Sequence, residues 1–78
     1  MNNDNLIRMA NQIGSFFESM PDRAEASKDL ATHIKKFWDP RMRRAFLAQL
    51  DHDGGKELSE IVRNAVQEHR AMLTPAQA

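Results

Sequence analysis

The segment Trp38-Asp39-Pro40 constrains the fold most strongly, because it ends one helix and begins another near the middle of a 78-residue chain. The Asp39 carboxylate is suited to cap a helix, and Pro40 fits the first helical position because it has no N–H to satisfy. Met20-Pro21-Asp22 gives an earlier break of the same kind. The glycine pair at 54–55 predicts a third break, since glycine favours the left-handed residue after a helix.

Between these breaks, apolar residues recur at intervals of three and four, which is typical of amphipathic helices. The pattern predicts helices over about residues 3–20, 23–37, 40–50 and 56–72, and no segment has the alternation of a strand. The expected fold class is therefore all-α, a small bundle of three to four short helices. We expect residues 1–78 to form a single helical domain with frayed termini at about 1–4 and 74–78.

Composition excludes several classes of function. The chain has no cysteine, which removes disulfides, zinc-thiolate sites, iron–sulfur ligation and thiol catalysis and suits a reducing cytoplasm. Lysine and arginine balance aspartate and glutamate at 11 each, whereas nucleic-acid and membrane-surface proteins usually carry a basic excess. No apolar run approaches the roughly 20 residues that cross a bilayer. We expect a soluble cytoplasmic protein that contacts neither nucleic acid nor membrane.

The apolar residues leave two questions open. Gly14 lies inside the first predicted helix, where it costs about 1 kcal/mol relative to alanine. It is either simply tolerated or a place where another backbone comes close. The five methionines, four phenylalanines and one tryptophan are a large apolar set for so short a chain. They form either an ordinary small core or a core with a further part that faces a partner.

No arrangement of residues predicts catalysis, and we expect no catalytic, cofactor-binding or metal-binding residue in this chain. Residues 51–55 begin like a calcium-binding loop, but the ligand and glycine positions that follow do not fit one, so a helix-ending turn is favoured. His33 and His69 fall on apolar stripes, where packed histidines are common. The serines occur in no nucleophile elbow, and no glycine-rich phosphate loop is present.

The stretch from Phe37 to Arg44 is the strongest candidate for a binding function. Residues 35–44 hold five cations and one acid, whereas residues 51–60 hold four acids and one cation. Tryptophan and arginine dominate interface hot spots, and guanidinium groups bind carboxylates or phosphates in a bidentate manner. The predicted partner-binding residues are Phe37, Trp38, Pro40, Arg41, Met42, Arg43 and Arg44.

An alternative use of the same charges is a small nucleic-acid-binding module. The second and third predicted helices with their short joint loosely resemble a helix-turn-helix, in which the basic helix 40–50 would read the nucleic acid. The joint lacks the usual glycine, however, and the acidic residues 51–60 follow that helix directly.

Several segments together resemble a known family, the delta subunit of the soluble NAD-dependent formate dehydrogenase. The resemblance covers about residues 6–66, in the order and spacing of that family. The segments that carry it are Leu6-Ile7-Arg8-Met9-Ala10-Asn11-Gln12-Ile13-Gly14, Phe16-Phe17, Met20-Pro21-Asp22-Arg23-Ala24-Glu25-Ala26, His33-Ile34 and Phe37-Trp38-Asp39-Pro40-Arg41-Met42-Arg43.

The resemblance implies a partner and a role. The family works in a complex that oxidises formate and reduces NAD with a molybdenum or tungsten pterin cofactor, iron–sulfur clusters and FMN, all carried by other subunits. It implies that this chain is not an enzyme and binds no cofactor itself. The expected role is an accessory subunit that docks to the catalytic (alpha) subunit and supports assembly, stability or cofactor insertion.

Overall fold

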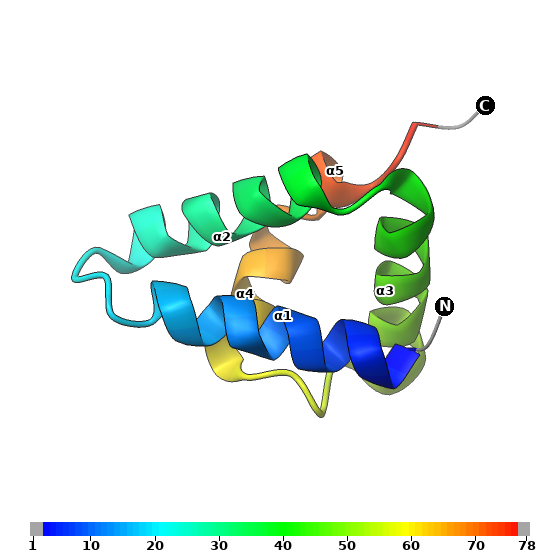
Figure 1. Ribbon diagram of the computed structural model, residues 1–78, viewed down its shortest axis with the longest axis horizontal. Coiled ribbons are helices and arrows are strands. Elements are labelled where there is room, and N and C mark those ends of the chain that lie inside the picture. The colour runs from blue at the N-terminus through cyan, green and yellow to red at the C-terminus, as the bar shows by residue number, and fades with distance from the viewer. Residues whose placement is uncertain (1–2, 77–78) are drawn as a thin grey trace.

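Helices account for most of the chain in the computed structural model, which describes residues 3–76. Within that range the helices are α1 (Asn3–Phe17), α2 (Arg23–Phe37), α3 (Pro40–Asp53), α4 (Glu60–Glu68) and α5 (Arg70–Leu73). Helices α1 and α2 run in opposite directions, α3 stands across one end of the pair, and α4 crosses behind both (Figure 1). The predicted all-α fold is confirmed. Of the termini expected to fray, residues 1–2 and 77–78 lie outside the described residues.

Two aspartates begin helices as the sequence predicts. The Asp22 side chain accepts a hydrogen bond from the backbone N–H of Glu25 at 3.1 Å at the start of α2. The Asp39 side chain accepts one from the N–H of Met42 at 2.9 Å at the start of α3. Each bond satisfies a donor that a helix start would otherwise leave unpaired. The local signals alone therefore place the starts of α2 and α3 correctly.

The acidic turn after α3 is a helix end, which is the favoured interpretation of its sequence. Gly54 adopts a left-handed conformation with φ of 73°, and its N–H donates to the Leu50 carbonyl at 2.8 Å. The Asp53 carboxylate accepts from the Gln49 amide at 2.9 Å and from the Gly55 N–H at 2.8 Å. These bonds lower the pKa of Asp53. Asp51 is held by Arg70, so both carboxylates of the turn have partners within the chain.

The last predicted helix differs from the structure at its start and in its continuity. The sequence predicts one helix over 56–72, whereas α4 begins at Glu60 and ends at Glu68, followed by the single turn of α5. The start is delayed because the N–H of Ser59 donates to the Asn11 side chain at 2.9 Å, a contact with α1 that a local pattern does not contain. After the break at His69, Leu73 is buried in the core.

Every helix contributes to one hydrophobic core, whose most deeply buried large side chains are Leu30, Ile34, Phe46, Val62, Val66 and Leu73. Gly14 of α1 lies directly against α4. A Cβ atom built on Gly14 would lie 2.6 Å from Cγ2 of Val62 and 3.2 Å from Cγ2 of Ile61. Of its two interpretations, the close approach of another element is therefore the one found. No helix in the stretch 3–76 is long and apolar enough to span a lipid bilayer.

Candidate functional site

The predicted binding stretch does not form one surface, because its tryptophan belongs to the core. Trp38 is 4% exposed, and its ring meets that of Phe46 edge to face with centroids 5.2 Å apart. Its neighbour Phe37 is 64% exposed. The expectation of an exposed tryptophan anchor therefore does not match its burial: the indole fixes the joint between α2 and α3. That the stretch as a whole binds a partner stays a prediction.

The arginines of the same stretch also separate into two kinds. Arg43 donates from Nε to the carbonyl of Trp38 and from Nη1 to the carbonyl of Leu73, both at 3.2 Å. It thereby ties the joint to the end of α5 and is used inside the protein. Arg41 and Arg44 are exposed, as is Pro40, and Met42 is half-buried. Two of the three arginines are thus free to meet another molecule.

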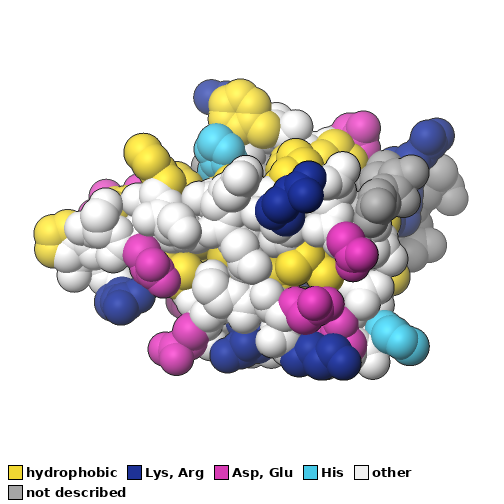
Figure 2. Space-filling view, turned by 60° about the horizontal axis from the view of Figure 1, so that its bottom comes forward, with side chains coloured by type: hydrophobic (Ala, Val, Ile, Leu, Met, Phe, Trp, Pro, Cys, Tyr) yellow, Lys and Arg dark blue, Asp and Glu magenta, His cyan; other side chains and the backbone are white. Residues whose placement is uncertain are grey.

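A groove between α1 and α2 is lined mainly by apolar residues, several of which also belong to the core or pack against it. Its volume is about 560 Å³. The residues that line it come from α1, α2, the joint and the first turn of α3: Met9, Gln12, Ile13, Phe16, Phe17, His33, Phe37, Trp38 and Met42. In Figure 2, hydrophobic side chains project from the upper edge of the molecule, and one of them lies directly beside a histidine.

A continuous series of ring contacts runs along this groove. Phe16 meets Phe17 edge to face with centroids 5.1 Å apart, and Phe17 lies 6.1 Å from His33. His33 in turn lies 4.7 Å from Phe37. The rings at the two ends of the series are the exposed ones, with Phe16 73% and Phe37 64% accessible to solvent. A contiguous exposed apolar surface of this kind is characteristic of an interaction site.

Positive charge borders the groove on the α2 and α3 side. The Lys36 ammonium lies 5.6 Å from the centroid of the Phe37 ring, within the range of a cation–π contact. Arg41 precedes the groove residue Met42 in the first turn of α3 and is exposed. None of the groove-lining residues is acidic. The groove is therefore an apolar surface with a basic border.

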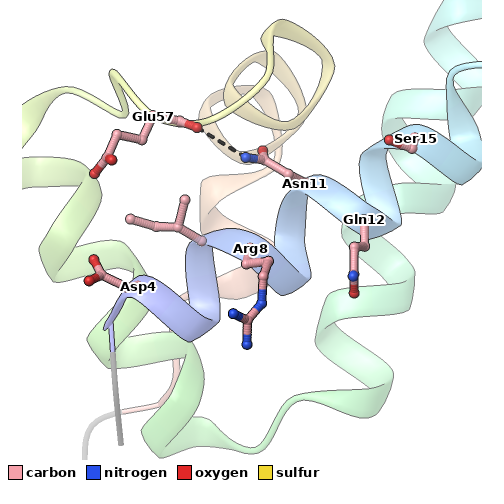
Figure 3. Close-up of a pocket in the computed structure, with 7 residues that line it drawn as sticks. Asp4, Arg8, Asn11, Gln12, Ser15 and Glu57 are labelled. Carbon is pink, nitrogen blue, oxygen red and sulfur yellow. Dashed lines mark hydrogen bonds between the residues drawn. The ribbon is translucent and has the colours of Figure 1, made fainter.

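A second hollow lies on another side of α1 and is built differently. It has a volume of about 450 Å³ and is lined mainly by polar residues of α1 together with Glu57. Figure 3 shows Asn11 turned towards Glu57, whereas Arg8 and Gln12 project away from it. Asn11 donates to the Glu57 carbonyl at 3.0 Å and accepts from the Ser59 N–H. The polar contacts at this second hollow hold the loop before α4, and its side chains do not point towards one common position for a ligand.

Nowhere in residues 3–76 do three or more histidine, aspartate or glutamate side chains gather in a way that could hold a metal ion. The sequence has no cysteine to ligate an iron–sulfur cluster. What the groove offers chemically is apolar contact area and adjacent positive charge, which suit binding.

Sequence reasoning missed the α1 half of the groove. Met9, Ile13 and Phe16 fit the apolar periodicity of α1, and that pattern does not say which of them pack in the core and which face a partner. One signal could have exposed the difference: Phe16 and Phe17 are adjacent, and neighbouring positions of a helix differ by about 100° in direction. Such a pair spans a wide arc of the helix, and here Phe17 packs against the core while Phe16 stays exposed.

The comparisons with known proteins give one match. Residues 5–66 match the protein family described as NADH-dependent formate dehydrogenase delta subunit FdsD. No curated protein and no solved structure matches the chain. The matched range includes all of α2, α3 and the groove residues. Because the match spans most of the 78 residues, the chain belongs to the family of formate dehydrogenase delta subunits.

Proposed function

We propose that this chain is a non-catalytic accessory subunit of a cytoplasmic, NAD-dependent formate dehydrogenase and docks to its catalytic subunit. The family match over residues 5–66 carries the proposal. In the proposed complex, the molybdenum or tungsten pterin cofactor, the iron–sulfur clusters, the FMN and the NAD site belong to other subunits. The role of the chain is to support the assembly, stability or cofactor loading of the catalytic subunit.

The physical properties of the chain support docking. Phe16 and Phe37 are large rings left mostly in solvent although the chain has a well-filled core elsewhere. Exposed aromatic side chains beside cations are the residue types that supply most binding energy in protein interfaces. The residues of the predicted stretch that remain available for this role are Phe37, Pro40, Arg41, Met42 and Arg44. Trp38 and Arg43 contribute by fixing the joint from which those residues project.

Co-expression tests the proposal directly. An affinity-tagged copy of the 78-residue chain, produced together with the catalytic subunit, should retain that subunit through purification in a constant ratio. Omission of the chain should lower the yield of catalytic subunit, or its content of molybdenum or tungsten measured by mass spectrometry. A catalytic subunit that neither co-purifies with the chain nor changes in yield or metal content would overturn the proposal.

The stage at which the chain is bound to the catalytic subunit separates two forms of the proposed role. A chain that stays bound to the active complex is a permanent subunit. A chain that binds the catalytic subunit only before metal loading is an assembly factor. Purification of the complex before and after supply of the metal therefore distinguishes them.

A further inference from the structure

The groove lies on the side of α1 that faces away from α4. Gly14 packs against Val62 and Ile61 of α4. Met9 and Phe16 lie roughly 140–160° around the helix from Gly14, because successive residues of an α-helix turn by about 100°. Helix α4 therefore covers one face of the α1–α2 pair, and the groove occupies the other. Within residues 3–76, no further element covers that second face.

The shape of this face favours a helix as its occupant. Two antiparallel helices present a groove between their side-chain ridges, into which a third helix packs well. A bound strand would need an open sheet edge to pair with, and the described part of the chain contains only helices and turns. The exposed rings of Phe16 and Phe37 stand at separate places along the groove. One comes from α1 and the other from α2, so a helix lying in the groove would meet a ring from each wall.

The charges specify the kind of helix. Lys36 lies against the Phe37 ring, and Arg41 is the exposed neighbour of the groove residue Met42. Neither cation has an ion-pair partner within the described residues. Asp39 is the acidic residue of the same stretch, and its carboxylate is already used to cap α3. A partner that brings carboxylates opposite Lys36 and Arg41 gains favourable pairing, whereas a basic partner meets like charge.

We propose that the groove binds an acidic amphipathic helix of the catalytic subunit, with apolar side chains between Phe16 and Phe37 and carboxylates facing Lys36 and Arg41. This inference rests on the proposed function, since it names the part of that partner which the groove recognises. The helix takes the position opposite α4 and completes a three-layer helical packing.

Site-specific photocrosslinking tests where the partner lies. The photoreactive amino acid p-benzoylphenylalanine is placed at position 16 or at position 37 of the full chain in complex with the catalytic subunit. Both sites are exposed, so the larger ring should be tolerated. The same residue at exposed position 67 on α4 is the control. The inference expects crosslinks from 16 and 37 in one helical segment that contains acidic residues, and none from position 67 to that segment.

Charge reversal tests whether Lys36 and Arg41 recognise an acidic partner. The double variant Lys36→Glu with Arg41→Glu should bind the catalytic subunit about tenfold more weakly, with a reduced dependence on salt. Arg23→Glu with Lys28→Glu is the matched control, because it also reverses one arginine and one lysine, both exposed on α2 and outside the groove lining. Circular dichroism checks that both variants remain helical. Equal weakening by the control, or no weakening by the double variant, would overturn the acidic character of the partner.

The outcomes distinguish this inference from the proposed function. Crosslinks to a loop, a strand or a second copy of this chain overturn the inference even when the chain co-purifies with the catalytic subunit. If neither groove position gives crosslinks while the chain still co-purifies with the catalytic subunit, the inference is overturned as well. The proposed function is then unaffected. Failure of the unmodified chain to bind the catalytic subunit removes both.

Discussion

The two sides of α1 are built from different kinds of residue. Towards α4 the helix presents Ala10 and Gly14, which are buried, and Asn11, which holds the loop before α4. Towards the groove it presents Met9 and Phe16, which are 37% and 73% exposed. Small residues let two helices approach until their side chains interlock, and this seals the first side. Large residues that no other described helix covers leave the second side open.

This difference indicates which side serves the fold and which serves binding. The sealed side stabilises the isolated chain, so a change there should lower its free energy of unfolding. The open side already exposes its apolar area to water, so its removal should cost the isolated chain little. Substitutions that separate folding from partner binding therefore test the assignment of each side.

Trp38→Ala should have the largest effect, a loss of about 3–5 kcal/mol in the free energy of unfolding, because it leaves a cavity beside Phe46. Urea denaturation followed by circular dichroism measures it. The adjacent Phe37→Ala is the control and should change stability by less than about 0.5 kcal/mol. Equal losses for the two variants would contradict the division between core and groove at this joint.

The double variant Phe16→Ser with Phe37→Ser should weaken binding of the catalytic subunit by about 2 kcal/mol or more, if the two rings act as hot spots. Its unfolding free energy should stay within about 0.5 kcal/mol of the unmodified chain, since both rings are exposed. Titration calorimetry and urea denaturation measure the two quantities. A variant that unfolds readily, or that binds as before, would remove the distinction between the two sides of α1.

Gly14→Val should destabilise the chain by about 1–3 kcal/mol, because its side chain would collide with Val62 and Ile61. Ser15→Val is the matched control: it places the same β-branched residue at the next, exposed position of the same helix. Thermal unfolding of the two variants provides the comparison. If Gly14→Val were no less stable than Ser15→Val, α4 would not pack as closely on α1 as described.

Asn11→Ala should lower stability by about 1 kcal/mol, because the Ser59 N–H and the Glu57 carbonyl both lose a partner. Gln12→Ala removes a similar amide from the neighbouring exposed position and should have almost no effect. Hydrogen exchange of the Ser59 amide gives a local measurement, and exchange should accelerate only in Asn11→Ala. Unchanged protection there would show that α1 does not hold the loop before α4.

Asp53→Asn should have the smallest effect, and one that depends on pH. Hydrogen bonds from Gln49 and Gly55 lower the pKa of folded Asp53 from its ordinary value of 3.8. Their contribution to stability is therefore present above that value and is lost as the pH falls through the lower folded pKa. Urea denaturation should show a small difference between the variant and the unmodified chain at pH 7 that shrinks below pH 4. A difference independent of pH would contradict this.

Local signals were sufficient for the ends of α2 and for the start of α3. The hydrogen bonds that cap α2 and α3 join Asp22 and Asp39 to residues three positions away. The bond from Gly54 to Leu50 at the end of α3 spans four positions. Both partners of each bond are therefore close together in the sequence. The family resemblance likewise rests on contiguous segments. The start of α4 could not be predicted in this way, since Asn11 and Ser59 lie 48 residues apart.

The sequence by itself determined the helical class, both ends of α2, the start of α3 and the family, because these depend on short-range patterns. Only the tertiary structure decided that Trp38 lies in the core while Phe37 lies in the groove, and that Arg43 is held by the carbonyls of Trp38 and Leu73. Periodicity identifies apolar residues without saying how many the core has room for. In the structure α4 packs against α1 at Gly14, and Met9 and Phe16 on the opposite side of α1 stay exposed.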